Sequence, residues 1–351
     1  MGEAVPWRTA MADALYGPAG FFTRAAPGGE QGTGPTGHFR TSAHASPLFA
    51  TVMLRLVAAV DEALGRPDPL DVVDIGAGGG HLLRRLAVLA PAYLARRLRL
   101  GAVELAPAPA DLPAEIGWSP AIPVPGSLCG LVIATEWLDN VPLDVAEVGE
   151  DGVLRYVLVE PLTGDETPGE PVTGEDAEWA DRWFSSVARE PGVRIELGGQ
   201  RDRSWAAAVA ALDLGLAITV DYGHMGDARP VAGTLTGFYA GRSASAVPDG
   251  SRDITAHVAV DAVCVAGANA AGEPGLVTTQ RDALTALGVD GSRPPVDLAN
   301  RDPAAYVGAL SAATQAAELI DAGGLGGHYW IVQPVGLPLE ALPVGLRPAA
   351  E

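Results

Sequence analysis

The segment best suited to chemistry is a glycine-rich turn at residues 76–80, which directly follows an apolar run ending at Ile75. Glycines at the carboxyl end of a first parallel strand let the backbone turn sharply and approach a ligand closely. Asp74, just before the turn, suits a ligand that carries an amino group, or it holds the loop through backbone N–H groups. We expect Asp74, Gly76, Ala77 and Gly78 to bind a cofactor here.

A second acid, Glu104, ends the next apolar run, residues 98–105. An acid at the tip of the second strand of such a sheet is placed to accept both ribose hydroxyls of a bound nucleoside. The glycine spacing does not follow the dinucleotide pattern G-x-G-x-x-G. A nicotinamide cofactor would nevertheless use the same acid. The turn and Glu104 together therefore predict a nucleoside-containing cofactor and leave its class open.

Two further acids, Glu136 and Asp139, come directly after the apolar run of residues 128–135. This position is again the carboxyl edge of the sheet, where open α/β folds bind ligands. Acids three positions apart share one face of a helical turn, and two carboxylates can grip a guanidinium through paired N–H···O bonds. The alternative interpretation is helix capping. Trp137 and Pro142 add a rigid apolar wall, so we favour a catalytic role for both acids.

A fourth polar cluster contains Asp221, Tyr222 and His224, at the end of the apolar run of residues 216–220. A histidine at this edge is tempting as a base, but a single such histidine is more often structural. The six histidines show no H-x-x-x-H spacing, so we expect no metal site. The chain also lacks G-x-S-x-G, which leaves a hydrolase unsupported.

The elements that must position these residues follow from periodicity. Apolar runs of strand length alternate with helical patterns, which predicts an α/β fold with a doubly wound, mostly parallel sheet. Residues 1–47 are rich in Gly, Pro and Thr and are predicted to form an N-terminal arm before a domain at 48–351. Residues 145–213 look like an inserted α+β segment, with a hairpin at 145–160 and an exposed loop at 161–176. Further expected elements are helices at 48–64, 82–89, 176–190, 201–213, 280–287 and 303–322, a strand at 329–335 and a loop-rich segment at 223–275.

The composition narrows the choice of partners. The chain has 351 residues, no lysine and a formal net charge of −20. So acidic a surface repels phosphate backbones, which argues against nucleic acid, and it favours a basic partner or simply high solubility. No apolar stretch is long enough to span a membrane and the first residues show no signal-peptide pattern, so we expect a cytoplasmic protein. The two cysteines, Cys129 and Cys264, cannot build a disulfide framework.

With these residues assembled, the chain resembles the MidA-like S-adenosylmethionine-dependent methyltransferases, which include the mitochondrial complex I assembly-factor arginine methyltransferase. The similarity covers most of the chain, and the ordered series of motifs is more specific than any one of them. The series comprises residues 15–18, 21–22, 37–42, 47–49, the 76–80 turn, 103–105, 136–142, 221–223, 233–238, 253–258 and 279–280. Three positions depart from the family pattern: Ala77 replaces Pro, Thr135 replaces Asn, and Ala106 replaces Ser.

The resemblance implies a Rossmann-like class I methyltransferase sheet that binds S-adenosyl-L-methionine through the glycine turn and the acid of the second strand. It implies that Phe39, Thr41 and Ser42 also bind this cofactor, as a lid. It further implies that Glu136 and Asp139 act in catalysis on a protein or small-molecule methyl acceptor, with a protein arginine among the candidates. Two alternatives stay open. One is a cofactor-binding assembly or interaction protein with little catalysis, and the other is a nicotinamide-dependent oxidoreductase.

Overall fold

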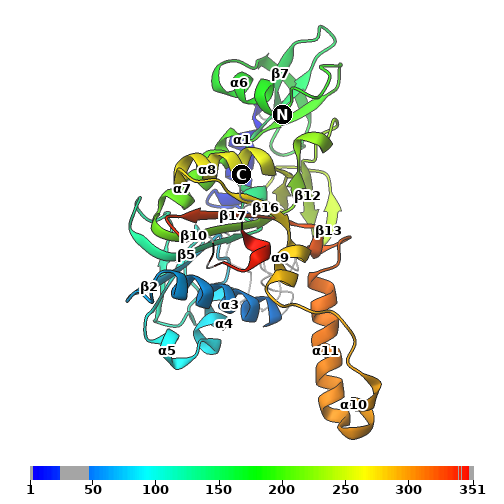
Figure 1. Cartoon of the computed structure of the whole chain (residues 1–351). Helices are drawn as coiled ribbons and strands as arrows, with labels where there is room; N and C mark the ends of the chain where they lie inside the picture. The colour runs from blue at the N-terminus through cyan, green and yellow to red at the C-terminus, as the bar shows by residue number, and fades with distance from the viewer. Residues whose placement is uncertain (1–2, 24–46, 339, 341, 348–351) are drawn as a thin grey trace.

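The computed structural model describes residues 3–23, 47–338, 340 and 342–347. Its centre is a seven-stranded sheet in the order β16-β17-β10-β5-β2-β3-β4 (Figure 1). The strands are β2 (Leu70–Ile75), β3 (Leu98–Val103), β4 (Ile116–Ser119), β5 (Leu128–Thr135), β10 (Leu212–Asp221), β16 (Leu276–Thr279) and β17 (Tyr329–Val335). From β10 to β4 neighbouring strands run parallel, whereas β17 is antiparallel to both β10 and β16. The prediction of a doubly wound, mostly parallel sheet is confirmed.

Helices cover both faces of this sheet. They are α3 (Pro47–Ala63), α4 (His81–Leu89), α7 (Gly199–Ala210), α8 (Val260–Ala271), α9 (Gln280–Ala286) and α11 (Pro303–Leu319). Successive side chains of a strand point to opposite faces, and β2 buries all six of its residues. Val72 belongs to the core shared with α3 and α4, while Val73 belongs to the core shared with α7 and α8. Figure 1 shows these two pairs of helices on opposite sides of the sheet.

A second sheet lies at one end of the molecule (Figure 1) and has the order β1-β7-β6-β9, with β8 beside β7. Its strands are β1 (Val5–Pro6), β6 (Asp144–Val148), β7 (Leu154–Val159), β8 (Glu166–Pro171) and β9 (Arg194–Leu197), accompanied by α6 (Gly174–Trp183). The hairpin expected at 145–160 is present as the antiparallel pair β6 and β7. Helix α1 (Trp7–Tyr16) packs on this sheet through Trp7, Met11 and Leu15. The N-terminal helix is thereby held beside the residues that follow β5.

Two segments that we expected to be loops contain regular structure. Residues 161–176 include β8, and residues 223–275 include α8. β8 contains two prolines and pairs only with β7, which is possible because an edge strand need not use every N–H group. α8 lies between α7 and β17 and is apolar on most sides, so its sequence lacks the polar stripe by which a surface helix is recognised.

The remaining elements are short. They are α5 (Ala92–Ala95), α10 (Val296–Arg301), β11 (Gly223–His224), β12 (Thr236–Tyr239), β13 (Arg242–Ala244), β14 (Asp253–Thr255), β15 (Val258–Ala259) and 3-10 turns at Leu138–Asn140, Gly226–Ala228, Leu325–Gly327 and Val344–Leu346. Together α10 and α11 project from the body (Figure 1). Across the described ranges, no helix is both long and apolar enough to cross a membrane.

The two central strands of the sheet approach each other at a pair of glycines. Gly130 in β5 lies opposite Gly215 in β10, with φ angles of 149° and 146°. A Cβ atom on Gly130 would lie 2.1 Å from the carbonyl oxygen of Asp71 in β2. One on Gly215 would lie 1.9 Å from the carbonyl oxygen of Gly130. Neither position accepts a side chain, because the obstructing atoms belong to the backbone of neighbouring strands.

We predict that Gly130→Ala lowers the free energy of unfolding by at least about 3 kcal/mol, since the methyl group would force β5 away from β2. The matched control is Gly126→Ala, at a left-handed φ of 66° with no atom within 4 Å of the added carbon, which we expect to cost only about 1 kcal/mol. Urea unfolding of both variants measures the difference. Similar losses in the two variants would contradict the proposed backbone overlap.

Candidate active site

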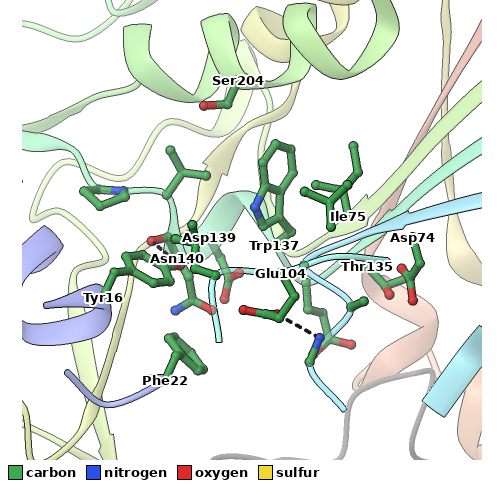
Figure 2. Close-up of a pocket in the computed structure, with 18 of the residues that line it drawn as sticks. Tyr16, Phe22, Asp74, Ile75, Glu104, Thr135, Trp137, Asp139, Asn140 and Ser204 are labelled. Atoms are coloured by element: carbon green, nitrogen blue, oxygen red, sulfur yellow. Dashed lines mark hydrogen bonds between the residues drawn. The ribbon is translucent and has the colours of Figure 1, made fainter. Parts of the chain in front are cut away.

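A cavity of about 610 Å³ opens at the carboxyl ends of β2, β3, β5 and β10 (Figure 2). This is the edge at which parallel sheets bind ligands. The structure brings most of the predicted site residues together here, since the lining includes Asp74, Gly76, Ala77, Gly78, Glu104, Glu136 and Asp139. Phe39, Thr41 and Ser42, which we expected to form a lid over the cofactor, lie outside the described residues.

The glycine turn needs its glycines for two separate reasons. Gly76, Gly78 and Gly80 have φ angles of 70°, 54° and 71°, in the left-handed region that favours glycine. A Cβ atom on Gly76 would also lie 2.8 Å from the Trp137 side chain. Gly76 is therefore required both by its left-handed backbone and because the Trp137 side chain leaves no room for a Cβ atom.

Glu104 connects the turn to the end of β3. One carboxylate oxygen accepts a hydrogen bond from the backbone N–H of Gly78 at 2.9 Å (Figure 2), and the other accepts from the backbone N–H of Ala106 at 3.0 Å. Each carboxylate oxygen can accept further hydrogen bonds, so these contacts orient Glu104 without using up its capacity. This arrangement is compatible with the predicted contact to ribose hydroxyls.

Asp74 provides a buried carboxyl group on the wall of the cavity. It is 3% exposed, and burial, followed by the nearby Glu104, raises the pKa of its carboxyl to about 8. Among the described residues its Oδ1 has no hydrogen-bond partner. A ligand ammonium group at this position would favour the ionised carboxylate and supply the missing donor. Thr135 ends β5, the strand beside β2, and lines the same cavity.

Glu136 and Asp139 do not share a helical face, so that expectation was wrong. Glu136 is half-buried and has a left-handed φ of 51°, and the 3-10 turn begins only at Leu138. Asp139 lies in the first turn of this 3-10 helix, as the capping alternative requires, and the N–H groups of Leu138 and Asp139 donate to Asp221 at 2.9 and 3.2 Å. Both predicted acids line the cavity, but they reach it from different backbone conformations.

Asp139 is held in a buried polar network. It is 4% exposed, and its Oδ2 accepts hydrogen bonds from the hydroxyls of Tyr222 and Thr255. Burial raises the pKa of its carboxyl, while these hydrogen bonds and the charge of Arg201 act in the opposite direction. In the described part of the chain, Oδ1 of Asp139 has no hydrogen-bond partner. Asp139, like Asp74, thus lines the cavity and has one carboxylate oxygen without a hydrogen-bond partner among the described residues.

Several residues of the site had no assigned role in the sequence analysis. The Asn140 amide donates to Asp253 at 2.7 Å, and burial, followed by Asp139, raises the pKa of Asp253 to about 8. Tyr16, from α1, donates to the Asn140 carbonyl at 3.2 Å (Figure 2), and the Phe22 ring stacks on Tyr16 at 5.7 Å. Residues 15–18 and 21–22 carry part of the resemblance, which was the one available signal for the two aromatic residues.

His224 does not line the cavity. Its Nδ1 lies 2.8 Å from the guanidinium of Arg229, and burial and that charge lower its pKa to about 3. It is a structural histidine, as the more conservative interpretation held. Within the residues that the structure describes, no group of three or more His, Cys, Asp or Glu side chains is arranged to hold a metal ion.

Comparisons with known proteins agree with this geometry. Residues 53–276 match the family model described as "Putative S-adenosyl-L-methionine-dependent methyltransferase". The fold is similar to a crystal structure from Burkholderia thailandensis bound to S-adenosyl-homocysteine, with 27% identity, a TM-score of 0.74, and coverage of 95% of this chain and 89% of that one. A native crystal structure of a protein from the same organism shows 26% identity and a TM-score of 0.75, with coverage of 98% of this chain and 91% of that one. No protein with a curated description matches the chain.

We predict that Glu104→Ala weakens the binding of S-adenosyl-homocysteine at least about tenfold, because hydrogen bonds to a charged acceptor contribute about 1.5–3 kcal/mol. Isothermal titration calorimetry measures the affinity. Glu115→Ala, which removes an exposed acid near β4, is the control and should bind normally. An unchanged affinity in Glu104→Ala would remove this residue from the cofactor site.

Proposed function

This chain belongs to the family of S-adenosyl-L-methionine-dependent methyltransferases, and we propose that its methyl acceptor is a guanidinium nitrogen of a protein arginine. The activity and the cofactor follow from the family and from the similar fold that binds S-adenosyl-homocysteine. The alternative of a nicotinamide-dependent oxidoreductase was therefore wrong. The choice of arginine as the acceptor rests on the acidic and aromatic residues that line the cavity.

The observation that carries the proposal is the unpartnered Oδ1 of Asp139, on a residue of the cavity wall and buried among the described residues. A buried carboxylate oxygen without a donor is costly, and a cationic ligand that donates an N–H group removes that cost. The part of the lining formed by the described residues is also rich in carboxyl groups. It contains five acids, Asp74, Glu104, Glu136, Asp139 and Asp253, and one arginine, Arg8. Arg8 itself lies 3.3 Å from Asp144.

The apolar part of the lining suits a planar cation. The aromatic rings of Tyr16, Phe22, Trp137 and Phe238 line the same cavity. A guanidinium is planar, is less strongly hydrated than an ammonium group and stacks on aromatic faces. Its N–H groups can at the same time reach carboxylates in the plane of the group. Aromatic walls with acids between them therefore favour arginine over lysine as the acceptor.

The reaction forms a bond between the acceptor nitrogen and the methyl carbon and breaks the bond between that carbon and sulfur, whose electron pair returns to the sulfur. When bound, S-adenosyl-L-methionine supplies the electrophilic methyl group. An arginine side chain has a pKa of about 12.5–13.8, so its nitrogen is a poor nucleophile until it is oriented and its proton is drawn away. Glu136 and Asp139 would orient the guanidinium, and Asp139 would accept that proton. Burial raises the pKa of Asp139, which makes it a stronger base than a solvated aspartate.

We predict that Glu136→Gln and Asp139→Asn each keep the affinity for S-adenosyl-homocysteine within about threefold of wild type and reduce methyl transfer by at least about 100-fold. Amides match the shape of these side chains but lack the charge and cannot accept the proton. Glu175→Gln, an acid whose side chain is 90% exposed, is the control. Calorimetry and transfer of radioactive methyl groups give the two values. Equal loss of binding and transfer would make these acids structural.

The acceptor itself is tested with a lysate of the cell that supplies the gene. The purified protein is incubated with the lysate and radioactive S-adenosyl-L-methionine, and labelled proteins are hydrolysed and separated into amino acids. We expect the label in methylarginine in the presence of wild-type protein and its absence with Asp139→Asn. Label in methyl-lysine or in base-labile methyl esters would overturn the choice of arginine while leaving the enzyme class intact.

A further inference from the structure

Tyr222 follows β10 and lines the cavity, and its hydroxyl donates to Oδ2 of Asp139. We propose that Tyr222 is a positioning residue of the acceptor site: together with Thr255 it engages Oδ2 of Asp139, fixes the orientation of the carboxyl group, and leaves Oδ1 as the oxygen without a protein partner. This inference rests on the acceptor site proposed above. It assigns Tyr222 a role through Asp139 and no direct contact with the reacting atoms.

The first support is the uneven use of the two Asp139 oxygens. Oδ2 lies within hydrogen-bonding distance of the hydroxyls of Tyr222 and, at 2.9 Å, of Thr255 in β14, and these two hydroxyls also contact each other. Oδ1 has no partner among the described residues. The two hydroxyls therefore fix the plane of the carboxyl group and leave one of its two oxygens without a partner among the described residues.

The second support is that Tyr222 is itself held in place. Its backbone N–H donates to Asp221 at 3.0 Å. Its ring lies edge-on to His257, with centroids 5.3 Å apart, and is tilted against His328 at 5.6 Å. Burial lowers the pKa of His328 to about 4, so this ring is neutral at physiological pH and adds no charge beside Asp139. A hydroxyl on a ring fixed in this way can direct a carboxylate.

The third support is electrostatic. Burial is the largest influence on Asp139 and raises its pKa, whereas the hydrogen bonds from Tyr222 and Thr255 lower it. Without the Tyr222 hydroxyl, the pKa of Asp139 would rise further. A larger fraction of the carboxyl would then be protonated at neutral pH and would neither attract a cation nor accept a proton. The acid side of the pH–activity profile would accordingly move to higher pH.

Other charged and titratable groups also face Asp139 and stay in place when Tyr222 is changed. They come from α1, the turn after β5, α7, β10, β14 and the segment after β14, and they are Tyr16, Glu136, Arg201, Asp221, Asp253 and His257. A shift that appears when one hydroxyl is removed therefore reports on that hydroxyl.

The experiment compares Tyr222→Phe with three other variants. Thr255→Val removes the second hydroxyl, and Thr255→Ser restores it. Tyr156→Phe is the matched control, because Tyr156 donates to Asp176 at 2.8 Å in the second sheet, away from the cavity. Aspartate labelled with ¹³C at the side-chain carboxyl reports the titration of Asp139, whose signal is the one missing from Asp139→Asn. Methyl transfer from radioactive S-adenosyl-L-methionine to lysate proteins is measured over the same pH range.

We expect the pKa of Asp139 to rise by about one unit in Tyr222→Phe, a tenfold change in its ionisation constant. The acid side of the transfer profile should move by the same amount, with affinity for S-adenosyl-homocysteine within about twofold of wild type. Thr255→Val should shift in the same direction, while Thr255→Ser and Tyr156→Phe should behave as wild type.

An unchanged Asp139 titration in Tyr222→Phe and Thr255→Val would overturn the proposal, as would transfer reduced equally at every pH. If Tyr222→Phe loses its folded structure, judged by circular dichroism, the Thr255→Val and Thr255→Ser pair decides alone. Failure of the proposed function has a different signature, because the label would then appear in methyl-lysine or in base-labile methyl esters whatever the titration of Asp139 shows.

Discussion

The wall of the cavity around Asp139 depends on one buried guanidinium. Arg201 belongs to α7 and is 1% exposed. It donates hydrogen bonds to the backbone carbonyls of Asp139, Val141, Ala256 and His257. These carbonyls belong to two segments far apart in the sequence, and a planar group with five N–H donors can join both. Asp139 lies on one of the joined segments and Thr255 is next to the other, so the carboxylate meets its hydroxyl partner only where Arg201 holds the two together.

The acids on the cavity wall bring a cost as well as a function. Burial raises the pKa of Asp74, Asp139 and Asp253, which means that the folded protein opposes the charge each of them would carry in water. Clusters of this kind reduce stability and are typical of functional sites. Cations in the cavity reverse the effect. A donor with an amino group and an acceptor with a guanidinium would each bring a positive charge to one end of the wall.

The part of the site that could be predicted from the sequence is the part built from one continuous stretch of chain. The turn residues and Glu104 belong to one strand–helix–strand segment, and Gly78 and Glu104, which bond directly, are 26 positions apart. The other side is assembled from distant segments, with Tyr16 bonding Asn140 across 124 positions and Thr255 bonding Asp139 across 116. Periodicity cannot reveal such contacts, because they depend on how α1 and β14 pack against the turn after β5.

The backbone conformation of Glu136 is another feature of the site that could not be predicted from the sequence. A helical turn was the expected conformation, yet Glu136 has a φ of 51°, and its N–H donates to the Val220 carbonyl at 2.7 Å. Glycine adopts this conformation without strain, whereas a residue with a side chain costs about 1 kcal/mol or more. Strain of this kind persists where the surrounding structure enforces it, and it concentrates at functional sites. The hydrogen bond to Val220 and the contacts of the following turn with Asp221 hold the backbone on both sides of Glu136, so the strain is set by the packing of β10 against the turn after β5.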